Sequence, residues 1–322
     1  MLVFNSHVHL NGSISLEYLK ETAKRNNCPD LYEKFILEKD LWKKFDWIHQ
    51  IMQTAEDVKL ATLDVVKHSN ADHIEIRTTA KPIGKYTVDN YIKAFIEGLK
   101  QANQLHPKKK VRGLLSIDRS KHSLEDAKAI IDTALKEKQT SGMIVGVDLS
   151  GNFLGKRTLT GNDLYLMLVY ALEKDVGIAL HVGEVDSEAE RNDFDTILKA
   201  IQEHKETRKG KIYGKVRLGH AIYRTSNQDD IIRKLKIPVE ICPSCHRKLD
   251  WWKQDQPHPI LTLYKHRTRV LSGTDDNLLF ECNDEKEQII LDEMLDIPSK
   301  YAHLSKEEQD NIVSKKRTRY MF

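Results

Sequence analysis

The chain has 322 residues, of which 40% are hydrophobic and 31% are charged, and its 51 Lys and Arg nearly balance its 48 Asp and Glu. The formal net charge of +3, with both signs spread along the chain, argues against a nucleic-acid polymer as partner, and no apolar run approaches the length of a membrane span. We therefore expect a globular protein that binds a small molecule, with no nucleic-acid partner and no membrane partner.

The first predicted element is a strand that carries His7-Val8-His9. Side chains alternate between the two faces of a strand, so His7 and His9 project to the same side. Two imidazoles on one face can bind one metal ion, but they can equally be ordinary, partly buried polar residues. The motif is therefore a hypothesis whose test is the rest of the chain.

Residues 15–53 show apolar residues at helical spacing, and we expect them to form a helical insertion over the mouth of a barrel. A capping signal at Thr54 opens the next helix. Short β-prone runs and helical segments then alternate. The predicted strands are 72–77, 111–117, 143–149, 177–181, 216–219, 237–242 and 269–272, and the helices after them are 90–104, 124–138, 161–174, 193–204, 228–235 and 259–265.

With the strand at His7, the pattern contains eight short, nearly continuous apolar strands, as expected of buried parallel strands. Eight β/α units predict an α/β fold, a (β/α)8 TIM barrel with additional helices after the first strand and at the C-terminus. An open doubly wound sheet is the alternative, but no Gly-X-Gly-X-X-Gly turn follows a strand. We expect one domain over residues 1–322, with 284–322 as C-terminal helices.

Polar residues follow these strands, and barrel enzymes carry their catalytic groups at the carboxyl ends of the strands. Each residue has an ordinary alternative, such as a buried histidine or an Asp that caps a turn. Their common position after eight separate strands is the argument for a site. The residues are His7, His9, Thr78, Thr79, Asp118, Ser150, His181, His220, Ser244, Asp275 and Asp276.

Four motifs, in this order, resemble the adenosine deaminase family: His7-X-His9-Leu-Asn-Gly-Ser, His181-X-Gly-Glu184, Gly-His220-Ala and Gly-Thr-Asp275-Asp276. The resemblance implies one Zn²⁺ per chain, bound by His7, His9, His181 and Asp275, and hydrolytic removal of the amino group from C6 of a purine. It implies Glu184, His220 and Asp275 as catalytic residues. Glu184 would protonate N1, His220 would orient the attacking water, and Asp276 would bind N7 of the base.

Asn11 bears on the substrate, because family members that act on free adenosine carry Asp there, beside the ribose 5′ position. A carboxylate about 4 Å from a phosphate would cost about 4 kcal/mol at an effective dielectric constant of 20, and a neutral Asn removes that penalty. Three motifs, His9-Leu-Asn11-Gly-Ser, Leu149-Ser-Gly151 and Ile48-His49-Gln50, resemble the adenosine-deaminase-like branch, whose members convert N6-methyl-AMP to IMP and methylamine. The implied substrate contacts are His9, Asn11, His49, Thr79, Ala80, Lys81, Asp118, Gly151 and Asp276.

Several alternatives stay open. Arg77 and Lys81 could hold the phosphate by charge, but Arg77 could equally form a structural ion pair. The role of His246 is open. Cys242-Pro-Ser-Cys245 differs from the zinc-binding cysteine pair of cytidine-type deaminases, because here the proline lies between the cysteines. Deamination of adenosine to inosine, and a catalytically silent purine-nucleotide-binding protein, are the alternative functions.

Cysteine use and the start of the chain bear on location. Four scattered cysteines are too few for a disulfide framework, which fits a reducing compartment. The first motif lies so close to residue 1 that no secretory leader fits before it. We expect a cytosolic protein that acts as a monomer on a small purine nucleoside monophosphate.

Overall fold

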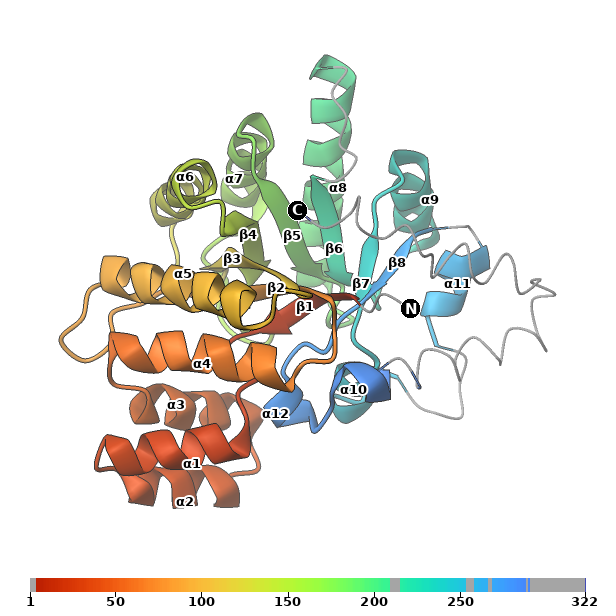
Figure 1. Cartoon of the computed structure of the whole chain (residues 1–322). Coiled ribbons are helices and arrows are strands. Elements are labelled where there is room, and N and C mark those ends of the chain that lie inside the picture. The colour runs from red at the N-terminus through yellow and green to blue at the C-terminus, as the bar shows by residue number, and fades with distance from the viewer. Residues whose placement is uncertain (1–3, 209–214, 253–257, 266–267, 288, 290–321) are drawn as a thin grey trace.

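The computed structural model describes residues 4–208, 215–252, 258–265, 268–287, 289 and 322. Its centre is an eight-stranded parallel sheet in the order β1-β2-β3-β4-β5-β6-β7-β8 (Figure 1). The strands are β1 Phe4–His9, β2 His73–Thr78, β3 Lys110–Asp118, β4 Ile144–Ser150, β5 Gly177–Val182, β6 Val216–His220, β7 Val239–Ile241 and β8 Val270–Ser272.

The sheet closes on itself through its first and last strands. Val8 forms a parallel bridge with Asp275, the N–H of His9 donates to the Asp275 carbonyl at 2.8 Å, and the Asp275 N–H donates to the His7 carbonyl at 2.8 Å. Closure removes the free edges of the sheet. The predicted (β/α)8 barrel is confirmed, and the open sheet is excluded.

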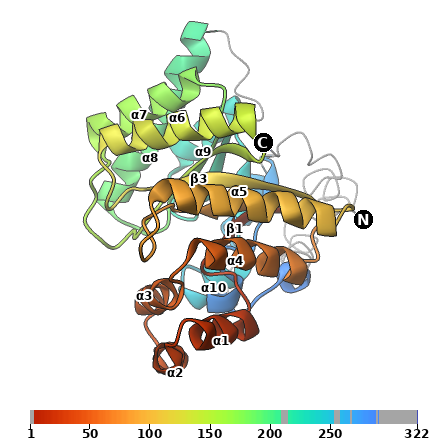
Figure 2. The same cartoon turned by 60° about the vertical axis from the view of Figure 1, so that its left-hand side comes forward.

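Helices surround the barrel (Figures 1 and 2). They are α1 Leu16–Arg25, α2 Pro29–Leu37, α3 Leu41–Ile51, α4 Ala55–His68, α5 Val88–Leu105, α6 Leu124–Thr140, α7 Gly161–Glu173, α8 Glu188–Arg208, α9 Ser226–Leu235, α10 Pro243–Lys248, α11 Ile260–Lys265 and α12 Asn277–Phe280. In both views α1, α2 and α3 lie together beyond α4, at one end of the molecule. No helix in these described ranges is both long and apolar enough to cross a bilayer.

The predicted capping signal at Thr54 is confirmed as a capping box. The Thr54 hydroxyl accepts from the Asp57 N–H at 3.1 Å, and Asp57 accepts from the Thr54 N–H at 2.9 Å. The same carboxylate also accepts from Arg25 at 2.6 Å and from the side chain of Asn26 at 2.8 Å. Asp57 therefore caps the first turn of α4 and connects the end of α1 to it.

The predicted helical region 15–53 consists of α1, α2 and α3, which end and restart at Asn26–Cys28 and at Glu38–Asp40. Two short helices, α10 and α12, were not predicted. Each has six residues or fewer, too short for a helical period to show in the sequence. The predicted C-terminal helices over 284–322 lie almost wholly outside the described residues.

Candidate active site

A cavity of about 520 Å³ opens at the carboxyl ends of the strands. Most of the predicted site residues line it: His9, Asn11, His49, Thr78, Thr79, Lys81, Asp118, Ser150, Gly151, His181, Glu184, His220, Asp275 and Asp276. His7 is completely buried and lies against the rings of His9 and His181. Ala80 lines a separate cavity between α5 and α6, and Ser244 lines neither, so these two predicted positions lie apart from the others.

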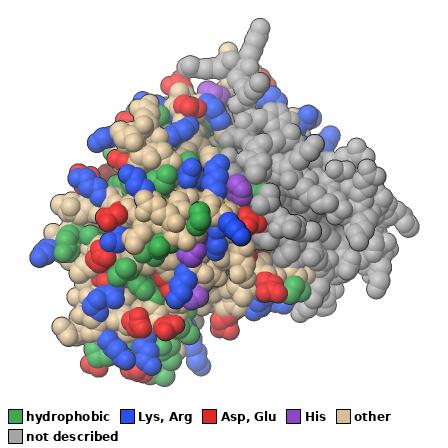
Figure 3. All heavy atoms as spheres, viewed as in Figure 1, with side chains coloured by type: hydrophobic (Ala, Val, Ile, Leu, Met, Phe, Trp, Pro, Cys, Tyr) green, Lys and Arg blue, Asp and Glu red, His purple; other side chains and the backbone are tan. Residues whose placement is uncertain are grey.

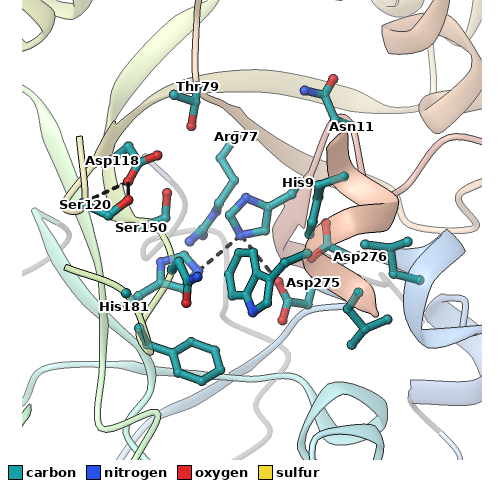
Figure 4. Close-up of a pocket in the computed structure, with 18 of the residues that line it drawn as sticks. His9, Asn11, Arg77, Thr79, Asp118, Ser120, Ser150, His181, Asp275 and Asp276 are labelled. Carbon is teal, nitrogen blue, oxygen red and sulfur yellow. Dashed lines mark hydrogen bonds and ion pairs between the residues drawn. The ribbon is translucent and has the colours of Figure 1, made fainter. Parts of the chain in front are cut away.

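His9, His181 and Asp275 meet at the floor of the cavity (Figure 4), and the buried His7 lies directly behind them. His9 Nε2 lies 3.1 Å from His181 Nε2 and 3.4 Å from Asp275 Oδ1, and His7 Nε2 lies 3.4 Å from the same Asp275 oxygen. Two atoms that bind one zinc ion lie about 3.3 Å apart, so these distances suit a shared ion. Among the described residues, the buried His7 Nε2 has no hydrogen-bond partner. A metal ion would give it one.

Two buried carboxylates orient these histidines from behind. Glu240 lies 2.9 Å from His7 Nδ1, and Asp148 lies 3.0 Å from His181 Nδ1, which is also hydrogen-bonded to the Leu149 carbonyl at 2.9 Å. An N–H at Nδ1 leaves the Nε2 lone pair free for a metal ion. The sequence prediction missed both residues, although a signal was available. Each is a carboxylate inside an apolar strand, in Val147-Asp148-Leu149 and Val239-Glu240-Ile241.

Arg77 belongs to this layer and forms the structural ion pairs that the sequence left as one of two alternatives. Its guanidinium lies 2.9 Å from Asp148 Oδ1 and 2.9 Å from Glu240 Oε2, and it donates to the Ser6 carbonyl at 2.7 Å. The side chain is completely buried. The guanidinium of Arg77 already donates to three acceptors of the protein itself, so a role as phosphate partner is not supported.

Glu184 lies at the wall of the cavity, on the loop after β5. Burial outweighs the nearby His181 and Arg119 and raises the pKa of Glu184 to about 7. The Arg119 guanidinium lies 4.0 Å from Glu184 Oε2 and donates to the His181 carbonyl. Gly183, at φ +69°, makes the turn between His181 and Glu184, and its N–H donates to Glu190 at 2.7 Å. A carboxyl with a pKa near 7 can act as a general acid at neutral pH.

The two adjacent aspartates have opposite electrostatic environments. Burial opposes ionisation of Asp275, but His7, whose Nε2 lies 3.4 Å away, and the neighbouring imidazoles hold its pKa well below the usual range. Burial and the charge of Asp275 hold the pKa of Asp276 well above it. Gly12 makes room for this second side chain, because a Cβ there would lie 1.8 Å from Asp276 Oδ1. Asp275 is therefore a candidate metal ligand, and Asp276 is a candidate hydrogen-bond donor.

His220, the last residue of β6, and Asp275, three residues after β8, both adopt the left-handed backbone region, at φ 62° and 60°. Non-glycine residues adopt this conformation at a cost, and such residues cluster at functional sites. His220 Nε2 lies 3.9 Å from Asp275 Oδ2 and 4.0 Å from Glu184 Oε1. His7, His181, His220 and Asp275 offer ligand atoms within 4.8 Å of one another, so distance alone allows His220 as an alternative ligand to His9.

The mouth of the cavity carries lysines and aromatic rings. Asn11 Nδ2 donates to His49 Nε2 at 3.0 Å, and burial together with Lys81 and Lys121 lowers the pKa of His49 to about 3. Burial and the charge of Lys121 lower the pKa of Lys81 to about 8. The rings of Trp42, Phe153 and Trp251 also line this mouth. The aromatic residues come from three separate elements and had no common signal in the sequence.

The cysteines do not form a metal site with the histidines. Cys242 and Cys245 are free and buried, and neither belongs to a group among the described residues that could hold a metal ion. Burial raises the pKa of both thiols well above the usual range, which opposes the thiolate form that zinc requires. This geometry does not support the cytidine-type arrangement.

A parallel barrel that carries catalytic side chains at the carboxyl ends of its strands is the architecture of the (β/α)8 enzymes. The family model described as adenosine deaminase matches residues 4–314, and the chain belongs to this family. The predicted family resemblance is confirmed.

Curated relatives extend over most of the chain. An N6-methyl-AMP deaminase from Xenopus laevis is 30% identical over 293 residues, which are 85% of this chain and 78% of the relative. The N6-mAMP deaminase of Arabidopsis thaliana is 28% identical over 84% of this chain and 80% of the relative.

Solved structures are similar over nearly the whole fold. The crystal structure of the Arabidopsis N6-mAMP deaminase MAPDA has a TM-score of 0.78 and 26% identity, and the match covers 99% of this chain and 95% of that one. A structure of an ADAL–IMP complex has a TM-score of 0.77 and 27% identity, with coverage of 97% and 90%.

Proposed function

We propose that this protein is a zinc-dependent deaminase that acts at C6 of a purine nucleotide, and that its substrate is N6-methyl-AMP, which would give IMP and methylamine. The observation that carries the proposal is the convergence of His7, His9, His181 and Asp275 on one point beside Glu184. The N6-methyl-AMP deaminases among the relatives and the ADAL–IMP complex support the substrate class.

His7, His9, His181 and Asp275 would hold one zinc ion per chain, with Glu240 and Asp148 orienting two of the imidazoles. Zinc lowers the pKa of a water molecule to about 7 and so supplies a nucleophile at neutral pH. The donor set of imidazole nitrogens and one carboxylate oxygen suits zinc.

The remaining residues would handle protons and orient the base. In the reaction a water oxygen bonds to C6, the C6–N6 bond breaks, and the amine leaves. The water loses both of its protons: one is taken up by the leaving amine, and the other replaces the proton that Glu184 gives to N1. Glu184, protonated at a pKa of about 7, would donate its proton to N1, where negative charge develops. Asp276, held protonated by burial and by Asp275, would donate to the N7 lone pair. The ring of His220 would orient the attacking water.

The charge at the mouth favours a nucleotide over a nucleoside. Lys81 and Lys121 both lie close enough to His49 to lower its pKa. Asn11, which is hydrogen-bonded to His49, is neutral. The buried Asn11 Oδ1 has no hydrogen-bond partner among the described residues, so it can accept from a ligand. Lys81 has no ion pair within 4 Å among the described residues and suits a phosphate group, whereas Lys121 already lies 3.2 Å from Asp118.

A substrate panel with metal analysis tests the proposal. N6-methyl-AMP, AMP and adenosine are compared at equal zinc occupancy, and we expect kcat/KM to be highest for N6-methyl-AMP. Faster turnover of adenosine would instead assign an adenosine deaminase. The Glu184→Gln variant should keep zinc and bind IMP while kcat falls by about 10²- to 10⁴-fold. A zinc-loaded wild type that binds IMP but turns over none of the three would be a silent nucleotide-binding protein.

The remaining expectations from the sequence belong to this proposal. We propose a monomer whose residues 1–322 form one domain, with the helices at 15–53 over the mouth. α3 supports this position, because Trp42 and His49 line the cavity. The free cysteines agree with a cytosolic location.

A further inference from the structure

Three histidines form a continuous chain that leads away from the cavity. His220 Nδ1 lies 3.1 Å from His246 Nε2, and His246 Nδ1 lies 3.1 Å from His258 Nε2. The side chains come from the end of β6, from α10 and from the segment before α11. All three residues are at least 98% buried, with exposed fractions of 1%, 0% and 2%.

The rings are held in place by two tryptophans. Trp251 stands edge-on to His220, with ring centroids 5.3 Å apart and an interplanar angle of 82°, and Trp252 stands edge-on to His258 at 5.0 Å and 71°. His246 and His258 stack at 5.3 Å. The backbone N–H groups of both tryptophans donate to the His246 carbonyl, at 2.9 and 3.1 Å. The imidazoles therefore have little freedom to rotate out of the chain.

The chain couples the proton positions on the three rings. All three rings are buried and bonded to one another through ring nitrogens, and burial disfavours the charged imidazolium, so each ring is neutral and carries one N–H. A hydrogen bond between two ring nitrogens needs one donor and one acceptor. Only two arrangements satisfy both bonds: every ring protonated at Nε2, or every ring protonated at Nδ1.

The surroundings of His220 decide between these arrangements. Its Nε2 faces Asp275 Oδ2 at 3.9 Å and Glu184 Oε1 at 4.0 Å, so oxygen acceptors lie in front of it. Carboxylate oxygens accept hydrogen bonds, so these two neighbours favour an N–H over a lone pair at this nitrogen. With its proton on Nε2, His220 accepts from His246 at Nδ1, and His246 accepts from His258 in the same way.

We propose that His246 and His258 are positioning residues that hold His220 in the Nε2–H tautomer, so that this ring donates a hydrogen bond to the attacking water. The role of the water rests on the proposed function, whereas the tautomer does not. A protonated Nε2 cannot bind a metal ion, because ligand nitrogens must carry a free lone pair. The chain of imidazoles therefore also favours His9 over His220 as the third histidine ligand.

The first test reads the tautomer directly. The full-length protein is labelled with 15N-histidine, and the ring nitrogens are followed by long-range 1H–15N correlation in the metal-free and the zinc-loaded states. We expect the proton of His220, His246 and His258 on Nε2 in both states. A proton on Nδ1 of His220 in the wild type would overturn the proposal, whatever the activity is.

A matched pair of variants tests the effect on the reaction. His246→Gln keeps an N–H that can reach His220 Nδ1, whereas His246→Leu has a side chain of similar size without a donor. We expect His246→Leu to lower kcat by about 10- to 100-fold with little change in KM for N6-methyl-AMP, and to give His220 a mixture of tautomers. His246→Gln should recover most of the activity.

Zinc content and thermal unfolding of each variant separate this effect from general damage. Equal losses of kcat in the Gln and Leu variants at equal zinc content would overturn the proposal. If the wild type deaminates no nucleotide, the proposed function fails, while the nitrogen spectra still decide the tautomer. If the wild type is active but His220 carries its proton on Nδ1, this inference alone fails.

Discussion

The interior of the barrel and the mouth of its cavity use charge in opposite ways. In the interior, Arg77, Arg217, Asp148 and Glu240 are completely buried, and each has an ion-pair partner in this group. At the mouth, Lys81 has no ion pair within 4 Å among the described residues, and Lys121, which is 76% exposed, pairs with Asp118 at 3.2 Å. The surface of the molecule shows a third pattern, since Lys, Arg, Asp and Glu are interspersed over the face in Figure 3.

This difference assigns separate tasks to the two regions. A buried charge without its partner is costly, so the interior ion pairs fix their side chains, and through Glu240 and Asp148 they fix His7 and His181. Charges at the mouth remain partly accessible to water, so they need no partner in the protein before a ligand binds. Interior substitutions should therefore change folding and metal binding, and substitutions at the mouth should change substrate affinity alone.

The largest expected effect comes from Glu240→Gln. Glu240 lies 2.9 Å from Arg77, 2.6 Å from Arg217 and 2.9 Å from His7, so the variant leaves two buried guanidinium groups with less compensating charge. We expect the free energy of unfolding to fall by about 3–5 kcal/mol, measured by denaturant titration. Glu97→Gln, at a 66% exposed side chain, is the control and should change it by less than about 0.5 kcal/mol. An equal loss of unfolding free energy in the two variants would show that interior ion pairs stabilise the fold no more than surface ones.

Asp148→Asn should act mainly on the metal. The variant keeps the shape of the side chain but loses the charge that faces His181 Nδ1 at 3.0 Å. We expect zinc affinity to fall by about 10- to 100-fold, measured by competition with a chelator. Ser116→Ala removes only a hydroxyl that donates to Asp148 at 2.8 Å, and its effect should be smaller. Unchanged zinc affinity in Asp148→Asn would contradict the orienting role.

These two residues also show how far the sequence leads. Hydrophobic periodicity predicted eight strands, and the rule that catalytic groups follow barrel strands placed His9, His181, His220 and Asp275 at one mouth. Asp148 and Glu240 lie within strands rather than after them, so that rule could not find them. Which residue pairs with a buried charge depends on the register between the strands of the barrel.

The sequence also did not predict which residues surround the candidate site residues. It offered two roles for Arg77, and burial decided between them. The contact between His220 and His246 depends on where a short helix begins after β7, and a helix of six residues is too short to show a period in the sequence. Residues that act through tertiary contacts are therefore the part that periodicity and motifs cannot supply.

The pH dependence of activity tests Glu184, which lies between the two regions. Its pKa is raised from an ordinary 4.5 to about 7, and the protonated form is the proposed acid. We expect kcat/KM to fall about tenfold per pH unit above pH 7 through this group, and a pH–rate profile measures it.

The same shift affects stability with a defined sign. The folded state binds the Glu184 proton more tightly than the unfolded chain, so its contribution is fully present below pH 4.5 and is lost as pH rises through about 7. Glu184→Gln cannot ionise, and its stability relative to the wild type should rise between these values. A relative stability that stays flat from pH 4.5 to 7 would show that the carboxyl is not desolvated.

The smallest expected effect belongs to the mouth. Lys81→Met keeps much of the side-chain volume but removes the cation, and we expect KM for N6-methyl-AMP to rise by up to about tenfold while KM for adenosine and the free energy of unfolding stay unchanged. Raising the salt concentration should narrow the difference between variant and wild type, because salt screens exposed charges. The exposed Lys85→Met is the matched control on the same loop.

The pKa of Lys81 adds an internal check on this variant. Because that pKa is lowered to about 8, the wild-type KM for the nucleotide should approach that of Lys81→Met as pH rises above 8. If KM for adenosine rises as much as KM for the nucleotide, Lys81 shapes the cavity rather than binding phosphate. The charge of Lys81 would then contribute to the structure of the protein, as the interior charges do, and not to substrate binding.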